Sequence, residues 1–319
     1  MALSPIAGTA TSGQLGGILF RVLVIVGTVV GSVLLLQTVL GSPPSPSFQR
    51  CQSVGAAAEI GQISKAQDFQ EMLDFYDLMQ EQIHRANTPL RDKTGLKRYA
   101  QNLHFMLESI LPQIPCETKV RIGGSGDGGK WVCNPWRLPE KCVIYSIGIG
   151  RELSFEVHLQ TYFQHRCRVI AIDPGENDFY EKMVPNSKYL KLAIGNKTSL
   201  VDGTSTLEDI MFRFEHKKLD ILKMDIEFAE FDVLPKLLKA SIVACHLLVE
   251  FHGQSVMKWV KLMEELEIGG YWLYAKEANT VCTANDPKTV CSEYSFIHSS
   301  CARQYNMRSE PLFTNFPHS

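Results

Sequence analysis

The sequence predicts an α/β fold of the Rossmann type, in which a mostly parallel sheet carries helices on both faces. The first observation is the segment 142–150, CVIYSIGIG, an apolar run that ends in a glycine turn. The second is the segment 168–174, RVIAIDP, an apolar run that ends in Asp173. The third is the segment 219–231, where an apolar run ends in acids and continues with a helical pattern. Buried parallel strands are near-continuous apolar runs, and ligands bind beyond their carboxyl ends.

The remaining elements alternate in the same way along the chain. Further strands are expected at 189–194, 245–251, 271–275 and 294–298, and helices at 152–165, 205–214, 231–239 and 255–266. Ser205 or Thr206 would cap the second of these helices, because hydroxyl side chains accept hydrogen bonds from the free N–H groups at a helix start. Pro235 would start or bend the third helix. The alternation of seven strands with helices favours one large α/β domain.

The N-terminal region is expected to lie outside this domain. Residues 22–40 carry no charge and follow Arg21, and a run of that length spans a hydrocarbon core of about 30 Å. We expect residues 1–21 to be a short cytoplasmic tail, 22–40 a transmembrane signal-anchor and 41–55 a Pro/Ser-rich stem. The alternative is a cleaved signal peptide and a secreted protein, although such peptides usually have an apolar core of about 7–15 residues. Both interpretations place the main domain in the secretory lumen.

Residues 56–114 are expected to form a helical cap, and residues 115–319 the main domain. Between positions 63 and 85, apolar residues recur at spacings of three and four, namely Phe69, Met72, Leu73, Tyr76 and Met79. That spacing is typical of an amphipathic helix. A second helix is expected at 91–111, before Pro112. Because the apolar stripe is too short for a sustained heptad pattern, a packed cap is favoured over an oligomerisation stalk.

Composition and charge exclude some classes of protein. The chain has 319 residues, of which 45% are hydrophobic and 21% charged, as in a globular protein. The net charge is −2, so nothing favours a nucleic-acid partner.

Cysteines support a lumenal domain. There are nine, at positions 51, 116, 133, 142, 167, 245, 282, 291 and 301, and none has the spacing of a metal site. Disulfides form in oxidising compartments. Cys133 and Cys142 flank a short loop and are the candidates for one bridge, and one pair is expected among the last three cysteines. Cys167 and Cys245 adjoin predicted core strands and are expected to be buried thiols, and the odd total leaves at least one cysteine free or intermolecular.

The glycine turn after the first strand indicates a nucleotide-type cofactor. Gly148 and Gly150 let the backbone approach a ligand closely, and Asp173 follows at the distance expected of a ribose-binding acid. A dinucleotide fingerprint needs a third glycine where this chain has Leu153. That departure disfavours a dehydrogenase, but it is compatible with S-adenosylmethionine, which has no pyrophosphate. The alternative is a purely structural turn.

A second glycine-rich stretch, residues 124–130, matches the spacing of a phosphate-binding P-loop. The next residue is Trp131, where a P-loop needs Ser or Thr to hold magnesium. No apolar strand leads into the stretch and no helix clearly follows it. A loop over the cofactor pocket is therefore the favoured interpretation.

Taken together, these motifs resemble the methyltransferase-like protein 24 group, which is related to the FkbM-type methyltransferases. The resemblance rests on residues 126–133 (GDGGKWVC), 145–150 (YSIGIG), 154–156 (SFE), 173–174 (DP) and 223–230 (KMDIEFAE). FkbM-type proteins typically read K-x-D-x-E-G-x-E at the fourth strand. Lys223, Asp225, Glu227 and Glu230 match that pattern, and Phe228 stands in place of its glycine. The resemblance implies a class I methyltransferase sheet of seven strands, the last of them antiparallel, and S-adenosylmethionine as cofactor.

The resemblance also implies roles for the cofactor-site residues. Gly148 and Gly150 would lie against the amino-acid end of S-adenosylmethionine. Asp173 would accept hydrogen bonds from both ribose hydroxyls, as a carboxylate can. Asp225 would face the ammonium group of the cofactor or the incoming nucleophile.

Three residues are candidates for catalysis. Asp225 and Glu227 are the first two, with a solvated or helix-capping role as the alternative because acids are favoured at helix starts. His252 follows the fifth strand and would act as general base, with a structural role as its alternative. Lys223 is expected to pair with a nearby acid.

The function expected from these features is lumenal S-adenosylmethionine-dependent methylation, most simply of an oxygen on a glycan or a secretory-pathway protein. A single anchor and a stem favour a type II Golgi membrane protein. Asn196 lies in the only sequon without a central proline, so we expect it to carry a glycan. This interpretation needs no metal. One alternative is a Golgi glycosyltransferase that holds a metal through Asp225 and Glu227. The other is a non-catalytic protein on a methyltransferase fold.

Overall fold

The computed structural model describes residues 110–312, apart from positions 126, 200, 254, 280 and 283–289, together with residues 70, 71, 74 and 314. The predicted tail, membrane anchor and stem, and nearly all of the predicted cap, lie outside these residues. Within the described part of the chain, no helix is long and apolar enough to cross a membrane. The anchor at residues 22–40 therefore stays a prediction.

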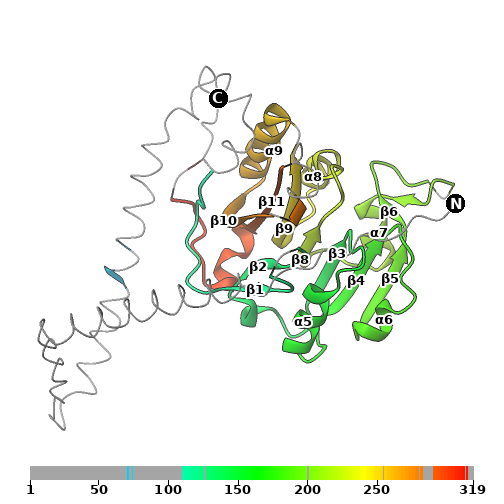
Figure 1. Ribbon diagram of the computed structural model, residues 1–319. Coiled ribbons are helices and arrows are strands. Elements are labelled where there is room, and N and C mark those ends of the chain that lie inside the picture. Colours follow the sequence, from blue (N-terminus) through cyan, green and yellow to red (C-terminus); the bar gives the residue numbers. More distant parts are fainter. Residues whose placement is uncertain are drawn as a thin grey trace, which may run out of the picture. The chain divides into compact units, whose positions relative to one another are not determined.

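The core of the molecule is a seven-stranded sheet with the order β10-β11-β9-β8-β3-β4-β5 (Figure 1). Its strands are β3 (Val143–Ile147), β4 (Arg168–Asp173), β5 (Ser187–Lys191), β8 (Leu219–Met224), β9 (Ala244–Gly253), β10 (Tyr271–Ala278) and β11 (Val290–His298). The pairs among β5, β4, β3, β8 and β9 are parallel. β11 lies between β9 and β10 and is antiparallel to both. The predicted mostly parallel sheet with an antiparallel last strand is confirmed.

Helices cover both faces of the sheet (Figure 1). They are α5 (Ser154–Tyr162), α6 (Tyr180–Met183), α7 (Leu207–Arg213), α8 (Glu230–Lys239), α9 (Val256–Ile268) and the 3₁₀ helices η2 (Pro135–Arg137) and η3 (Ser299–Tyr305). Buried residues of α7, α8 and α9 belong to one hydrophobic cluster, and those of α5, α6 and η3 to another. Thr206 is the cap of α7, and its hydroxyl accepts a hydrogen bond from the Asp209 N–H at 3.2 Å. Pro235 lies inside α8 rather than at its start.

Two short strand pairs differ from the sequence prediction. The strand predicted at 189–194 is broken, because the Leu192 N–H turns back to the Leu190 carbonyl, and the chain continues as β6 (Ala193–Ile194) paired with β7 (Thr204–Ser205). The glycine-rich stretch is the loop of an antiparallel hairpin, β1 (Lys119–Ile122) with β2 (Lys130–Cys133). A short strand therefore leads into the stretch, but it is not the apolar strand that a P-loop needs. β1 has only four residues and is largely exposed, so it has no apolar run to detect.

Four disulfides correct the predicted pairing. The bonds are Cys116–Cys133, Cys142–Cys167, Cys245–Cys301 and Cys282–Cys291. The proposed Cys133–Cys142 bridge is wrong, because Cys142 enters β3 beside Cys167, which enters the neighbouring parallel strand β4, with the two Cα atoms 4.5 Å apart. Cys167 and Cys245 are bonded rather than free thiols. One pair among the last three cysteines is confirmed.

Candidate active site

The turn after β3 is shaped by its first glycine. Gly148 has a φ of +71°, and a Cβ at this position would stand 1.5 Å from the carbonyl oxygen of Asp225. The Asp225 N–H in turn donates to the Ile147 carbonyl at 3.0 Å. No side chain fits between these backbones, so the turn after β3 and the turn after β8 are in direct contact. Gly150 has a φ of +55°, and a Cβ there would meet nothing within 4 Å.

Asp173, at the end of β4, connects the turn after β3 to the turn after β4 through hydrogen bonds. One carboxylate oxygen accepts hydrogen bonds from the N–H groups of Ile149 at 2.8 Å and Gly150 at 2.9 Å. The other accepts from the Gly175 N–H at 2.7 Å. This bracing role was not foreseen from the sequence. A carboxylate has about four acceptor positions, so it leaves room for the predicted bonds to a ribose.

Two adjoining pockets open at this edge of the sheet, and both are lined by Gly148, Asp173, Asp225 and Glu227. The first, of about 230 Å³, is the more polar of the two and is called the polar pocket below, with further lining residues Asp127, Gly128, Ile149, Gly150, Arg151, Glu152 and Lys223. The second, of about 260 Å³, is mostly apolar, with Ile147, Ile172, Pro174, Leu192, Ala193, Ile194, Ile226 and Ala229. The first pocket thus brings together the residues that the sequence assigned to cofactor binding, Gly148, Gly150, Asp173 and Asp225. A ligand with one polar end and one flat apolar end fits such a pair of pockets.

The hairpin loop forms one wall of the polar pocket. Asp127 and Gly128 line it, and Gly128 has a φ of +77°. A Cβ at Gly128 would stand 2.2 Å from Cγ of Glu152, so the loop packs directly on the turn that precedes α5. The interpretation of this stretch as a loop over the pocket therefore agrees with the geometry.

The turn after β8 holds two non-glycine residues in the left-handed region, Glu227 with a φ of 50° and Phe228 with a φ of 78°. Such a conformation is disfavoured for a bulky residue and persists where the surrounding structure imposes it. Phe228 stands where the FkbM-type pattern has glycine, and its ring centroid lies 5.4 Å from that of His252. Phe228 thus has a strained backbone conformation and places an aromatic ring beside His252.

His252 is buried near the end of β9, with 4% of its side chain exposed. Its Nδ1 lies 2.9 Å from a carboxylate oxygen of Glu230, and its Nε2 lies 3.4 Å from Glu227 and 3.7 Å from Asp225. Burial alone would lower the pKa of His252, but the hydrogen bond to Glu230 and the charges of the three acids together raise it. The structure therefore joins His252 to both predicted catalytic acids. A raised pKa makes the imidazole a stronger base while reducing its neutral fraction.

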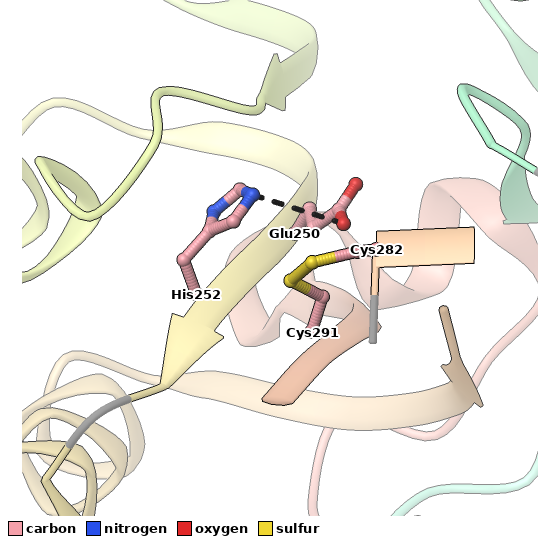
Figure 2. A group of neighbouring side chains, drawn as sticks. All are labelled: Glu250, His252, Cys282 and Cys291. Carbon is pink, nitrogen blue, oxygen red and sulfur yellow. Dashed lines mark ion pairs between the residues drawn. A yellow bond between two sulfur atoms is a disulfide. The ribbon is translucent and has the colours of Figure 1, made fainter. Parts of the chain in front are cut away.

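The sequence did not predict a buried charged cluster next to His252, formed by Lys130, Glu250 and Glu293. Lys130 of β2 lies 2.6 Å from Glu293 and 3.7 Å from Glu250, and all three are almost fully buried. Burial, followed by the charges of Glu293 and Asp225, raises the pKa of Glu250 well above its usual range. Glu250 and His252 lie side by side on β9, next to the Cys282–Cys291 disulfide (Figure 2). The one sign of this cluster in the sequence is Glu250, a single acid in the apolar run CHLLVEF, because a carboxylate in a buried strand needs a partner.

Lys223, on β8, pairs with the buried Glu156 of α5 at 3.4 Å, as predicted. Glu156 also accepts a hydrogen bond from the Ser146 hydroxyl. The ammonium group at the floor of the polar pocket is therefore already balanced by a carboxylate.

Comparisons with known proteins assign the fold to a family. A family model described as a methyltransferase domain matches residues 64–298. Probable methyltransferase-like protein 24 of Homo sapiens is 27% identical over 158 residues, which are 42% of this chain and 42% of that protein. The same protein of Rattus norvegicus is 25% identical over 185 residues, 51% of this chain and 49% of that protein. The chain thus matches less than half the length of these relatives.

The similarity to solved structures is low. The Methanococcus jannaschii fibrillarin pre-rRNA processing protein has a TM-score of 0.32 and 11% identity, covering 50% of this chain and 67% of its own. M. jannaschii TYW2 in complex with AdoMet has a TM-score of 0.31 and 14% identity, covering 52% and 73%. A Burkholderia thailandensis 1,6-didemethyltoxoflavin-N1-methyltransferase with S-adenosylhomocysteine has a TM-score of 0.32 and 10% identity, covering 81% and 99%. Because these TM-scores are low, the family assignment depends on the family model alone. That model describes a methyltransferase domain, so the glycosyltransferase alternative has no support among these comparisons.

Proposed function

Because this chain belongs to the family of methyltransferase domains, we propose that it transfers the methyl group of S-adenosylmethionine to an oxygen of a glycan or of a secretory-pathway protein. The observation that carries this proposal is the pair of joined pockets lined by Gly148, Asp173, Asp225 and Glu227. They lie beyond the carboxyl ends of β3, β4 and β8, where an open α/β sheet binds its ligand.

The two pockets hold different parts of the cofactor. The polar pocket takes the amino-acid end, with Gly150 and Arg151 among its lining residues. The apolar pocket takes the adenine, between Ile172 and Ile226. Asp173 belongs to both pockets and holds the ribose between them. S-adenosylmethionine supplies an activated methyl group on a positively charged sulfur.

The residues of the chain position the acceptor and accept its proton. Asp225 faces both pockets, and His252 stands 3.7 Å behind it with its ring fixed by Glu230. An acceptor hydroxyl that enters beside these residues loses its proton to the Asp225–His252 pair. Glu227, which is 79% exposed, then passes the proton to water. The main contribution of the protein is alignment, since methyl transfer needs donor and acceptor in line.

Calorimetry on the purified full-length chain tests the cofactor assignment. We expect S-adenosylhomocysteine to bind with a 1:1 stoichiometry and S-adenosylmethionine to compete with it. Incubation with labelled donor and a panel of lumenal glycans and proteins then identifies the acceptor. A folded chain that binds neither compound would contradict the proposal.

The compartment proposed is the secretory pathway, with the chain as a single-pass type II protein of the Golgi or a related membrane and its methyltransferase domain in the lumen. Four disulfides support an oxidising compartment. The uncharged residues 22–40 and the Pro/Ser-rich residues that follow support an anchor and a stem. Cleavage after the apolar segment would instead release a secreted protein.

Asn196 provides the test of this topology. It is exposed in the turn between β6 and β7, while Ile194, two residues earlier, lines the apolar pocket. We expect a glycan at Asn196 when the chain is made in secretory cells, measured as a mobility shift on enzymatic deglycosylation that Asn196→Gln removes. A domain that carries no glycan and is cut by protease added to the cytoplasmic side would overturn the lumenal assignment.

A further inference from the structure

Three side chains from two neighbouring strands converge beside the donor pocket. Asp225 and Glu227 follow β8, and His252 is near the end of β9, its parallel neighbour. One ligand atom from each lies within 4.8 Å of the other two. Because the carboxyl ends of parallel strands meet at one edge, this juxtaposition follows from the order of the sheet.

The imidazole of His252 is held in a fixed orientation. Its Nδ1 lies 2.9 Å from Oε1 of Glu230, a fully buried carboxylate that also accepts the Ile226 N–H at 3.1 Å. Since a carboxylate accepts, Nδ1 carries the hydrogen and Nε2 is free to act as a ligand. Nε2 points towards Asp225 and Glu227 without a hydrogen bond to any residue that the structure describes. Histidines that bind metals are typically fixed in this way by a carboxylate on the other ring nitrogen.

The distances agree with ligands around one ion. Two ligands that each lie about 2.1 Å from a metal stand roughly 3.0–3.4 Å apart. Nε2 of His252 lies 3.4 Å from Glu227 and 3.7 Å from Asp225. Glu227 is 79% exposed and Asp225 is 19% exposed, so both carboxylates can adjust and one side stays open to solvent. Catalytic metal sites keep such an open position for water or substrate.

We propose that Asp225, Glu227 and His252 bind one divalent transition-metal cation at the mouth of the donor pocket. One imidazole and two carboxylates suit Mn²⁺ or Zn²⁺ better than Ca²⁺, which takes oxygen ligands alone. The neighbouring group of Glu250, His252, Cys282 and Cys291 is not this site, because the disulfide in Figure 2 leaves neither sulfur as a thiolate.

The role of this cation rests on the proposed function. Its substrate would be the acceptor hydroxyl of the methyl transfer. Bound at the open position, the hydroxyl has a lowered pKa and loses its proton to water. The new carbon–oxygen bond forms as the carbon–sulfur bond breaks, and sulfur keeps the electron pair. With the cation bound, Nε2 of His252 holds it and the proton goes to water; without the cation, His252 keeps the general-base role of the proposed function.

Metal titration of the purified full-length chain tests the site directly. After chelator treatment and dialysis, MnCl₂ and ZnCl₂ are titrated by calorimetry into the wild type, Asp225→Asn, Glu227→Gln and Asp202→Asn. Asp202 is an exposed acid in the turn before β7 and serves as the matched control. We expect one ion per wild-type chain, a Kd raised at least about tenfold in both site variants and an unchanged Kd in the control. Pulsed electron paramagnetic resonance of bound Mn²⁺ should show coupling to one imidazole nitrogen.

The outcomes separate this inference from the proposed function. Absence of binding, wild-type affinity in both Glu227→Gln and Asp225→Asn, or bound Mn²⁺ without nitrogen coupling would overturn the cation site. If S-adenosylhomocysteine still binds in that case, the methyltransferase proposal stands and His252 keeps its role as a base. If the metal binds as expected but neither donor compound does, the cation site stands and the proposed function fails.

Discussion

Asp173 has two tasks in the structure, because the carboxylate that faces the pockets also accepts three backbone N–H groups. In Asp173→Asn, one of the two acceptor oxygens becomes an amide N–H₂ and can no longer accept the N–H groups bound to it. We expect a loss of about 1–3 kcal/mol in the free energy of unfolding and a weaker affinity for S-adenosylhomocysteine by at least about tenfold. Urea unfolding and calorimetry measure the two effects. Asp178→Asn, an exposed acid nearby, is the control, and equal donor binding by Asp173→Asn would contradict the assignment.

Phe228 allows the strain in the turn after β8 to be measured. At ordinary positions glycine is less stabilising than alanine, but at a φ of 78° the order reverses because only glycine avoids the Cβ clash. We expect Phe228→Gly to be more stable than Phe228→Ala by about 1 kcal/mol in urea unfolding. Both variants lose the ring beside His252 and should alter the KM for the acceptor while leaving donor affinity unchanged. A lower stability for the glycine variant would show that the backbone is not strained.

At the scale of elements, the sequence predicted the strands that build the site and missed the hairpin that closes it. The runs ending in Gly148, Asp173 and Asp225 are long and apolar, because each strand is covered on both faces. β1 and β2 are short and partly exposed, so their pattern carries no such signal. Pairing of Cys142 with Cys167 depends on which strands are neighbours, and no spacing along the chain shows that. Lys130 and Glu293 come together for the same reason.

The hairpin loop is expected to affect donor binding more than folding. Gly128 has a φ of +77°, and an added Cβ would meet the Glu152 side chain at 2.2 Å. Gly203 has a φ of +61° with nothing within 4 Å, so Gly203→Ala has similar backbone strain without the contact. We expect both alanine variants to lose about 1 kcal/mol of stability. Only Gly128→Ala should weaken S-adenosylhomocysteine binding, by several-fold in calorimetry, and equal affinities for the two variants would exclude the loop from the cofactor site.

At the scale of the whole molecule, His246 makes stability depend on pH. It is fully buried, its Nδ1 lies 3.1 Å from the Tyr274 hydroxyl, and burial lowers its pKa from 6.5 to about 3. Between these two values the unfolded chain binds a proton that the folded chain does not, so stability falls as the pH falls. The loss between pH 7 and pH 5 is about 2 kcal/mol. Burial raises the pKa of its neighbours Tyr274 and Tyr305, so neither titrates in this range.

Urea unfolding of the wild type and His246→Phe at both pH values checks this expectation. The aromatic replacement keeps the packing against Tyr305 but cannot bind a proton. The pH dependence of the variant should therefore be smaller by about 2 kcal/mol. Identical pH dependence in the two proteins would show that His246 does not couple acid to unfolding.

The position of β11 has a consequence for how the protein is made. This strand lies inside the sheet, between β9 and β10, yet it is the last of the seven to leave the ribosome. Lys130 precedes its partner Glu293 by 163 positions, and at about 5–20 residues per second that separation takes on the order of ten seconds or more to translate. Until then β9 is an open apolar edge and Lys130 lacks its carboxylate on β11. The nascent chain is therefore most exposed to aggregation, and most in need of chaperones, in the interval before β11 is translated.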